Sequence, residues 1–198
     1  MMRRGIRGVA SALLALAATA AWRPLVDALK LRPESTLSFD GKSTVRDWSC
    51  KATQIDARIE ADPGAVAGVL QAHKAVKTVT LTFPTAKLDC ANGTMNGHMM
   101  RALAGTQFPT IVFTLTGYEL TAGAPVKGPL NGTLTIKGVT KPISIPAEYA
   151  AAPGGALRVT GKYALNMTEW TVEPPKLMMG ALKVDPTILV NFDLQLQP

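Results

Sequence analysis

The chain has little of what most catalytic and metal sites are built from. Its 198 residues include only two histidines and two cysteines. Neither His73 nor His98 has a cysteine, serine or carboxylate at a spacing that implies a proton relay. A zinc site would need more ligands than two cysteines and two distant histidines bring together. We therefore expect no catalytic residues, no metal and no cofactor, and an enzyme is the least favoured class.

Basic clusters, linkers and repeats are also missing. Lysine and arginine are scattered, and no aromatic residues interleave with them. The net charge of +7 falls to about +4 once residues 1–20, which hold three arginines, are set aside. Nucleic acid is therefore not an expected partner. Because no Ser-rich or Pro-rich linker divides the chain, we expect residues 21–198 to form a single domain.

The N-terminal apolar run is too short to span a bilayer comfortably, since spanning takes about 20 residues. It covers residues 9–17, follows three arginines, and precedes Ala18-Thr19-Ala20, which has the small-x-small pattern of a cleavage site. This order predicts a cleaved secretory signal over residues 1–20 and a periplasmic or secreted protein. An uncleaved membrane anchor is the alternative. Gly5-Ile6 after the arginine pair favours ordinary secretory export over the twin-arginine route.

The two cysteines, Cys50 and Cys90, are too far apart for a CxxC redox motif. Export to an oxidising compartment makes a disulfide the expected state of an isolated pair. Closing a loop of this length stabilises a fold by about 3 to 4 kcal/mol in the chain-entropy model.

Alternation of apolar and polar side chains runs through most of the chain. In Gly132 to Pro146, Leu134 and Ile136 share one face of a first strand. Ile143 and Ile145 share one face of a second strand, and a glycine supplies the turn between the two. The other strands that this pattern predicts are Thr36–Gly41, Ser43–Lys51, Ala52–Glu60, Thr78–Phe83, Thr110–Leu120, Leu157–Met167 and Thr187–Gln197.

Two segments show helical spacing instead. Residues 62–73 begin with Asp62 as a cap and Pro63 at the first helical position, and apolar residues then recur at helical spacing. In Thr94–Leu103, apolar side chains lie one turn apart.

The architecture follows from the apolar faces of the strands. Two short helices cannot cover seven or eight antiparallel strands, so the apolar faces must pack against one another in a sandwich or a closed barrel. We predict an all-β fold, an antiparallel eight-stranded barrel with one or two short helices. Gly117, Gly132 and Gly161 fall in phase with inward positions and are expected to leave space. An apolar tube with space left over favours a long apolar ligand.

The segment Met167 to Gly180 is the second feature of interest. Pro174-Pro175 disfavours regular structure, so Leu177, Met178 and Met179 are expected on a loop, where they form either a flap over the barrel mouth or a plug of the barrel end. The predicted ligand-binding residues are Phe83, Met95, Met99, Ile111, Phe113, Leu115, Leu134, Ile136, Ile143, Ile145, Val159, Tyr163, Trp170, Leu177, Met178, Met179, Ile188, Val190 and Phe192.

The hairpin phrase GTLTIKGVTKPISIP resembles the signature hairpin of the YceI family. Similar phrasing recurs in STLSFDGKSTVRDWSC, FPTIVFTLTGYEL and KVDPTILVNFDLQL, so the resemblance runs from Ser35 to the C-terminus. Lys137 departs from it, because the family often has a histidine there. The resemblance implies a lipocalin-like fold and a periplasmic protein that binds polyisoprenoid or other long-chain lipids.

The same resemblance implies that the ligand is isoprenoid-quinone-like or fatty-amide-like. Any membrane contact is expected to be transient and to serve lipid exchange. The alternative is a non-enzymatic structural or stress-response interaction protein with a packed barrel. Two points stay open: whether His98 contacts a head group, and the oligomeric state, for which a homodimer is one option.

Overall fold

The computed structural model describes residues 27–177 and 182–198. The predicted signal peptide, residues 1–20, lies outside the described residues, and so do Met178 and Met179 of the predicted flap. The predictions made for these residues stay predictions.

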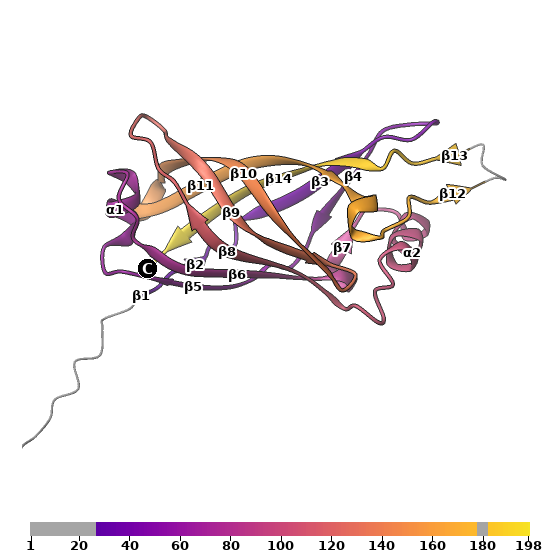
Figure 1. The fold of residues 1–198 in the computed structure, drawn as a ribbon, viewed down its shortest axis with the longest axis horizontal. Coiled ribbons are helices and arrows are strands. Elements are labelled where there is room, and N and C mark those ends of the chain that lie inside the picture. The colour runs from indigo at the N-terminus through magenta and orange to yellow at the C-terminus, as the bar shows by residue number, and fades with distance from the viewer. Residues whose placement is uncertain (1–26, 178–181) are drawn as a thin grey trace, which may run out of the picture.

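A curled antiparallel sheet forms most of the molecule (Figure 1). Within the described ranges the sheet has 12 strands. They are β1 (Asp27–Ala28), β2 (Lys30–Leu31), β3 (Thr36–Gly41), β4 (Trp48–Ala52), β5 (Asp56–Ala61), β6 (Val76–Pro84), β7 (Leu88–Asp89), β8 (Thr110–Tyr118), β9 (Val126–Ile136), β10 (Val139–Ala152), β11 (Ala156–Asn166) and β14 (Thr187–Gln197). A separate pair, β12 (Lys176–Leu177) and β13 (Leu182–Lys183), extends beyond one end of the barrel.

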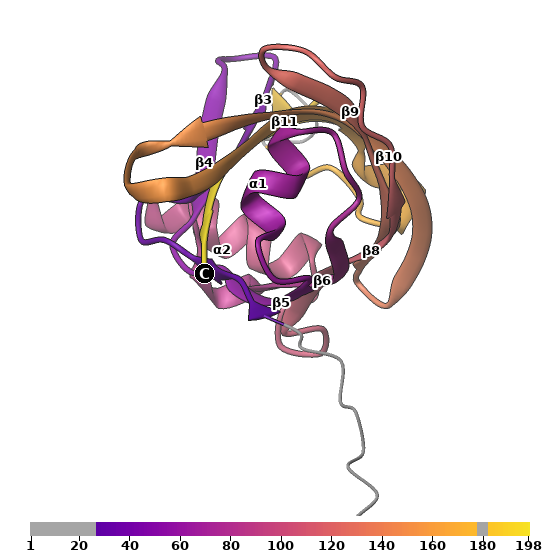
Figure 2. The same ribbon diagram turned by 90° about the vertical axis from the view of Figure 1, so that its left-hand side faces the viewer.

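The N-terminal segment closes the sheet into a barrel. Its first part, β1, pairs with β5, where Asp27 lies opposite Ala61. Its second part, β2, pairs with β14, where Leu31 lies opposite Leu196. Because β5 and β14 are far apart in strand order, this one segment joins them. Figure 2 looks along the barrel and shows the sheet curling around its axis, which confirms the predicted all-β antiparallel barrel.

The predicted hairpin is β9–β10, and its two-residue turn is formed by Lys137 and Gly138, with φ of 49° and 76°. Positive φ at both turn residues gives the backbone twist that matches right-twisted strands. Pro142 and Pro146 lie in the part of β10 that pairs with β9 alone, because pairing with β11 begins at Ala147. Their missing N–H groups therefore cost the sheet little.

Two predicted strands begin later than expected. β4 begins at Trp48 rather than at Ser43, and β5 begins at Asp56 rather than at Ala52. In the first case Ser43 Oγ donates to the carbonyl oxygen of Arg46 (2.8 Å) and accepts from the Arg46 N–H (3.1 Å). This local turn competes with ladder pairing and replaces it.

Both predicted helices are present, α1 (Ala65–Leu70) at one end of the barrel and α2 (Gly93–Ala102) at the other (Figure 1). The predicted cap of α1 is wrong, because the helix begins after Gly64, which has φ of 73° and makes no side-chain cap. Asp62 instead pairs with Lys77 at 2.9 Å. Short 3-10 helices at Thr85–Lys87, Pro153–Gly155 and Met167–Trp170 link strands that follow one another in the chain.

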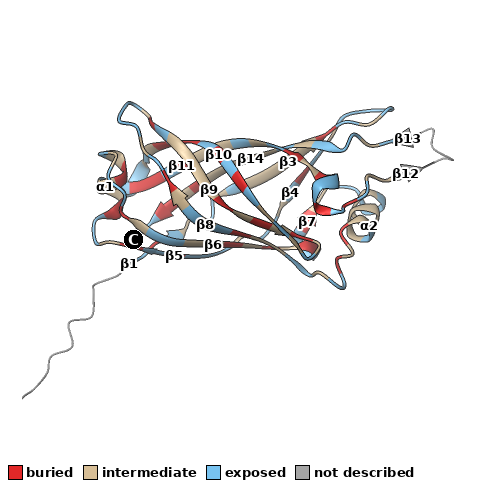
Figure 3. Ribbon diagram, in the orientation of Figure 1, coloured by how far each residue is buried: buried red, intermediate tan, exposed pale blue. Residues whose placement is uncertain are grey.

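Buried and exposed residues alternate along the strands (Figure 3), as the sequence pattern predicts. The buried residues form two apolar clusters. The cluster nearer α1 includes Val69 of that helix together with Tyr149, Leu157 and Val159. The other, nearer α2, includes the side chains of β6, β8 and β9 and part of β10.

The prediction that Gly132 and Gly161 leave space inside the barrel is wrong. A β-carbon at Gly132 would overlap the ring of Phe113, and one at Gly161 would overlap the ring of Phe192. These glycines therefore allow aromatic rings of neighbouring strands to lie close across the sheet. A β-carbon at Gly117 would meet nothing. Because Gly161 and Phe192 are the middle residues of β11 and β14, the interior is filled at about half its length.

Candidate ligand-binding cavity

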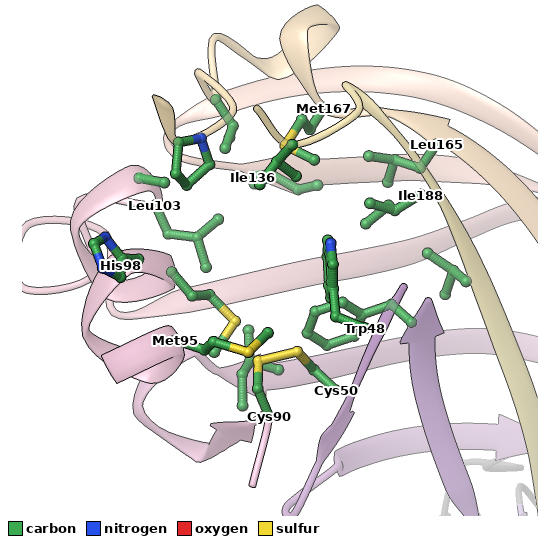
Figure 4. A pocket seen from close by; sticks show the side chains of 18 of the residues that line it. Trp48, Cys50, Cys90, Met95, His98, Leu103, Ile136, Leu165, Met167 and Ile188 are labelled. Atoms are coloured by element: carbon green, nitrogen blue, oxygen red, sulfur yellow. A yellow bond between two sulfur atoms is a disulfide. The ribbon is translucent and has the colours of Figure 1, made fainter. Parts of the chain in front are cut away.

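An apolar cavity of about 310 Å3 lies in the half of the barrel nearest α2. Strands β3, β4, β6, β8, β9, β11 and β14 contribute its wall, and residues of α2 lie along one side of it (Figure 4). Its volume corresponds to on the order of ten water-sized groups of about 30 Å3 each. The lining is almost wholly apolar, which favours an apolar occupant.

The structure brings only part of the predicted ligand-binding set to this cavity. The predicted residues that line it are Phe83, Met95, Met99, Ile111, Leu134, Ile136, Ile188 and Val190. The described residues of the set that do not line it are Phe113, Leu115, Ile143, Ile145, Val159, Tyr163, Trp170 and Phe192. Most of these residues pack within the cluster nearer α2 without facing the cavity, and Val159 belongs to the cluster nearer α1.

Several lining residues were not assigned to the site by sequence reasoning. They include Leu37, Phe39, Trp48, Leu103, Leu165 and Met167. The signal that could have found the strand residues is the period of two, because Leu37 and Phe39 alternate with polar neighbours in β3. Trp48 shares its phase with Cys50 in β4 in the same way.

α2 is held beside the cavity by a covalent bond and by polar contacts. The predicted disulfide is present between Cys50 of β4 and Cys90, just before the helix, and both cysteines line the cavity (Figure 4). Asn96 of α2 accepts from the Cys90 N–H (2.8 Å) and donates to Asp89 (2.8 Å). The Asn96 amide and the Ala91 N–H (3.0 Å) lower the pKa of Asp89 by favouring its carboxylate.

Residues 42–47, which join β3 to β4, form a second rim of the cavity. The backbone N–H of Thr44 donates to the carbonyl oxygen of Lys183 (3.0 Å), which ties this loop to β13. Val45 at its tip lines the cavity, yet 68% of this residue is exposed. The loop and β13 therefore form one connected rim that carries an apolar side chain in solvent.

The polar side chains of the lining come mostly from these rims. Ser43 and Arg46 belong to the loop, and His98 belongs to α2. Ser43 Oγ is occupied by its own turn with Arg46. His98 Nδ1 lies 2.9 Å from a guanidinium nitrogen of Arg101, which gives the ring a local partner.

Trp170 and Leu177 behave differently from the expectation of a flap. Trp170 is 1% exposed, and its Nε1 donates to the carbonyl oxygen of Leu134 (2.9 Å), so it packs as a plug against the wall. Leu177 belongs to the short strand β12 rather than to an irregular loop. Lys137, at the position where the expected histidine is replaced, donates from Nζ to the carbonyl oxygen of Thr171 (2.9 Å).

In the part of the chain that the structure describes, no three His, Cys, Asp or Glu side chains gather closely enough to hold a metal ion. Among residues 27–177 and 182–198 there is likewise no helix with the length and hydropathy needed to cross a membrane.

Comparison with known proteins points to one family. The family model for the YceI-like domain matches residues 31–196. No curated protein sequence matches the chain.

Solved structures share the fold at low sequence identity. BcnA of Burkholderia cenocepacia is 17% identical with a TM-score of 0.64, and the match covers 82% of this chain and 96% of that one. A polyisoprenoid binding domain from Saccharophagus degradans, implicated in plant cell wall breakdown, is 13% identical with a TM-score of 0.60, covering 86% and 97%. A YceI protein of Campylobacter jejuni is 21% identical with a TM-score of 0.56, covering 74% and 82%.

Proposed function

Because the chain belongs to the YceI-like domain family, we propose that it binds one long apolar lipid chain in the cavity beside α2 and carries or sequesters that lipid without chemistry. The observation that carries this proposal is the cavity itself, about 310 Å3 with an almost wholly apolar lining. A similar structure from Saccharophagus degradans is described as a polyisoprenoid binding domain, which supports the same ligand class.

Burial of the lipid's hydrocarbon chain supplies the binding affinity. Each buried methylene contributes about 0.8 kcal/mol, so ten of them contribute about 8 kcal/mol before ordering costs are subtracted. Affinity in the micromolar range or weaker is enough for a carrier that must also release its lipid.

The cavity also suggests how the lipid lies. Phe192 packs against both apolar clusters without lining the cavity, which supports a cavity that ends before the α1 half of the interior. Ser43 and Arg46 of the loop 42–47 and His98 of α2 supply polar side chains at the rims of the cavity. The tail therefore enters first, and the head group stays at the rim.

We further propose that the protein works in the periplasm and that its ligand is isoprenoid-quinone-like or fatty-amide-like. The disulfide between Cys50 and Cys90 supports an oxidising compartment. Exposed Val45 at the rim supports brief membrane contact during lipid exchange. The competing proposal, a packed barrel that only interacts with other proteins, describes the α1 half of the interior but not the half that holds the cavity.

The test of the proposed function combines the native ligand with a variant of the wall. Protein purified from its native periplasm should yield a long-chain lipid in a solvent extract, measured by mass spectrometry. Ile136→Asp should abolish binding of a fluorescent fatty-acid probe, because an unpaired charge among apolar side chains is costly.

The matched control is Thr114→Asp, at an exposed position of β8, which should bind the probe as the unchanged protein does. Circular dichroism shows whether each variant is folded. If Ile136→Asp unfolds, Ile136→Ala replaces it and should weaken binding of the probe. The proposal would be contradicted if the extracts contained no lipid and the Ile136 variants bound the probe as tightly as the unchanged protein does.

A further inference from the structure

The rims of the cavity carry polar side chains that can hold a head group. Ser43, Arg46 and His98 supply them, and no Asp or Glu among the described residues lines the cavity. The hydroxyl group of Ser43 is already used in its turn with Arg46. Arg46 and His98 therefore decide which head group the rims can bind.

The guanidinium group of Arg46 reaches from the loop 42–47 to α2. Its Nη2 lies 3.9 Å from Sδ of Met95, and Met95 itself lines the cavity. Figure 4 shows Met95 next to the disulfide between Cys50 and Cys90. A thioether sulfur is a weak acceptor, so this contact satisfies little of a group that has five N–H donors. The loop therefore holds a cation with free donors at the mouth of the cavity.

This cation has no counter-charge in the protein. None of the five ion pairs among residues 27–177 and 182–198 includes Arg46. Asp47 follows Arg46 in the chain, but its carboxylate forms none of these pairs and does not line the cavity. The planar fork of a guanidinium matches the paired oxygens of a carboxylate or a phosphate. An anion at the mouth would therefore pair with the group that the protein leaves unpaired.

His98 adds a second donor, because Arg101 fixes the position of its proton. A guanidinium nitrogen of Arg101 lies 2.9 Å from His98 Nδ1. A guanidinium group only donates, so Nδ1 accepts and the neutral ring carries its proton on Nε2. His98 follows Met95 by three residues in α2, which places both on one face of the helix. The face that Arg46 reaches therefore also carries the donor of His98.

We propose that the mouth of the cavity is an anion subsite, in which Arg46 binds the head group of a lipid that ends in a carboxylate or a phosphate and His98 donates to the same group. The proposal rests on the proposed function and adds a preference to it. The carbonyl oxygen of a quinone or an amide accepts from the same donors, but only an anion also neutralises the charge of Arg46. Anionic lipids therefore bind more tightly than neutral lipids with the same hydrocarbon chain.

Four ligands with the same hydrocarbon chain test this preference: decanoate, decyl phosphate, 1-decanol and decylammonium. Isothermal titration calorimetry measures the affinity of the protein for each of them. Decanoate and decyl phosphate should each bind about three- to tenfold more tightly than 1-decanol, the size of a charge-assisted hydrogen bond that solvent partly screens. Decylammonium should bind more weakly than 1-decanol, because the mouth offers it a like charge.

Arg46→Gln removes the charge and keeps a polar side chain. In this variant the ratio of decanoate affinity to 1-decanol affinity should fall close to one, and Arg46→Lys should restore most of it. The matched control is Arg58→Gln, at an exposed position of β5 outside the lining. It changes the net charge by the same amount and should leave the ratio as it is in the unchanged protein.

Three outcomes would count against these proposals. If Arg46→Gln and Arg58→Gln lower the ratio equally, net charge and not a subsite is responsible, and the anion subsite is overturned. It is also overturned if the unchanged protein binds 1-decanol as tightly as decanoate, and in that case the proposed function stands. If none of the four ligands binds, the subsite and the proposed function both fail.

Discussion

Two tyrosines show how differently single residues satisfy a buried hydroxyl group in this barrel. Tyr118 accepts from the Val76 N–H at 2.8 Å and donates to the Val76 carbonyl oxygen at 3.4 Å. Tyr149, in the cluster near α1, has no partner for its hydroxyl among the described residues. Burial raises the pKa of Tyr149, because the phenolate would lose its hydration.

We therefore expect removal of the hydroxyl group to have opposite effects on stability at the two tyrosines. Tyr149→Phe should leave the free energy of unfolding unchanged or raise it by up to about 1 kcal/mol, because it removes an unpaired polar group. Tyr118→Phe should lower it by about 0.5 to 1.5 kcal/mol, because it leaves Val76 unpaired. Urea denaturation of both variants measures the difference, and equal losses would contradict it.

Tyr149 also predicts a pH dependence. Its ordinary pKa is 10.0 and its pKa in the folded protein is higher, so only the unfolded chain ionises as the pH rises past 10.0. The unfolded state then binds fewer protons than the folded state, and stability falls with rising pH. Below pH 10.0 the tyrosine is protonated in both the folded and the unfolded state, so Tyr149 causes no loss of stability there. Tyr149→Phe should lose this part of the alkaline decline in urea midpoints, whereas an unchanged decline would exclude Tyr149 as its source.

At the scale of elements, α2 depends on its anchors. The helix contributes no fully buried residue, so packing alone holds it weakly, and the Cys50–Cys90 bond joins its N-terminal side to β4. Asn92 caps its first turn by accepting from the Met95 N–H at 3.0 Å.

Removing the bond should therefore loosen α2 before it unfolds the barrel. The double variant Cys50→Ala with Cys90→Ala should lose about 4 kcal/mol of stability in the chain-entropy model for a 40-residue separation. Amide exchange should accelerate in α2 more than in β10 and β11. Uniform acceleration across the barrel would show that the bond acts on the whole fold and not on this helix.

The loop between β3 and β4 provides the second test at this scale. If Val45 inserts into the membrane during exchange, Val45→Ser should slow lipid transfer from vesicles severalfold, since a buried valine contributes about 1.5 kcal/mol or more. Its equilibrium affinity for lipid should change less than the transfer rate, because most of Val45 is exposed. Leu189→Ser, at the other exposed large hydrophobic residue of the described chain, is the control and should leave the transfer rate unchanged. Equal slowing by both would contradict a specific role for the loop.

At the scale of the whole molecule, the barrel has two unlike halves. The half near α1 is packed by Leu157, Val69 and their neighbours, and the half near α2 contains the cavity. Phe192, whose ring lies over Gly161, packs against the apolar clusters of both halves. The boundary therefore limits how long a chain the barrel accepts.

Trimming that boundary should lengthen the accepted ligand. Phe192→Leu, alone or with Phe113→Leu, should cost about 1 to 2 kcal/mol per substitution and allow affinity to keep rising with chain length beyond the limit of the unchanged protein. Titration with fatty alcohols of increasing length measures the limit. Phe108→Leu, at a ring that packs on Gly138 outside the lining, is the control. A limit that stays the same in the Phe192 variant would show that the cavity ends elsewhere.

The sequence by itself determined the strands, the barrel class and the disulfide. Alternation is a local property with a period of two, so Ile143 and Ile145 show their dry face without knowledge of any partner strand. The helical spacing in Thr94–Leu103 is likewise a local pattern, and it predicted α2. The isolated pair Cys50 and Cys90 predicted the disulfide. Local patterns misjudged the start of β4, where the side chain of Ser43 competes with the ladder.

Only the tertiary structure decided where the interior is empty and where it is filled. Gly161 appeared to leave space because its own side chain is absent, but the ring that fills the space belongs to Phe192, which β14 places directly opposite. The ring of Trp48 packs over Gly41, which lies opposite it across another ladder, and edge-to-face on Phe39. Both outcomes depend on the register between strands and on packing at a distance, and no pattern within a single strand contains either.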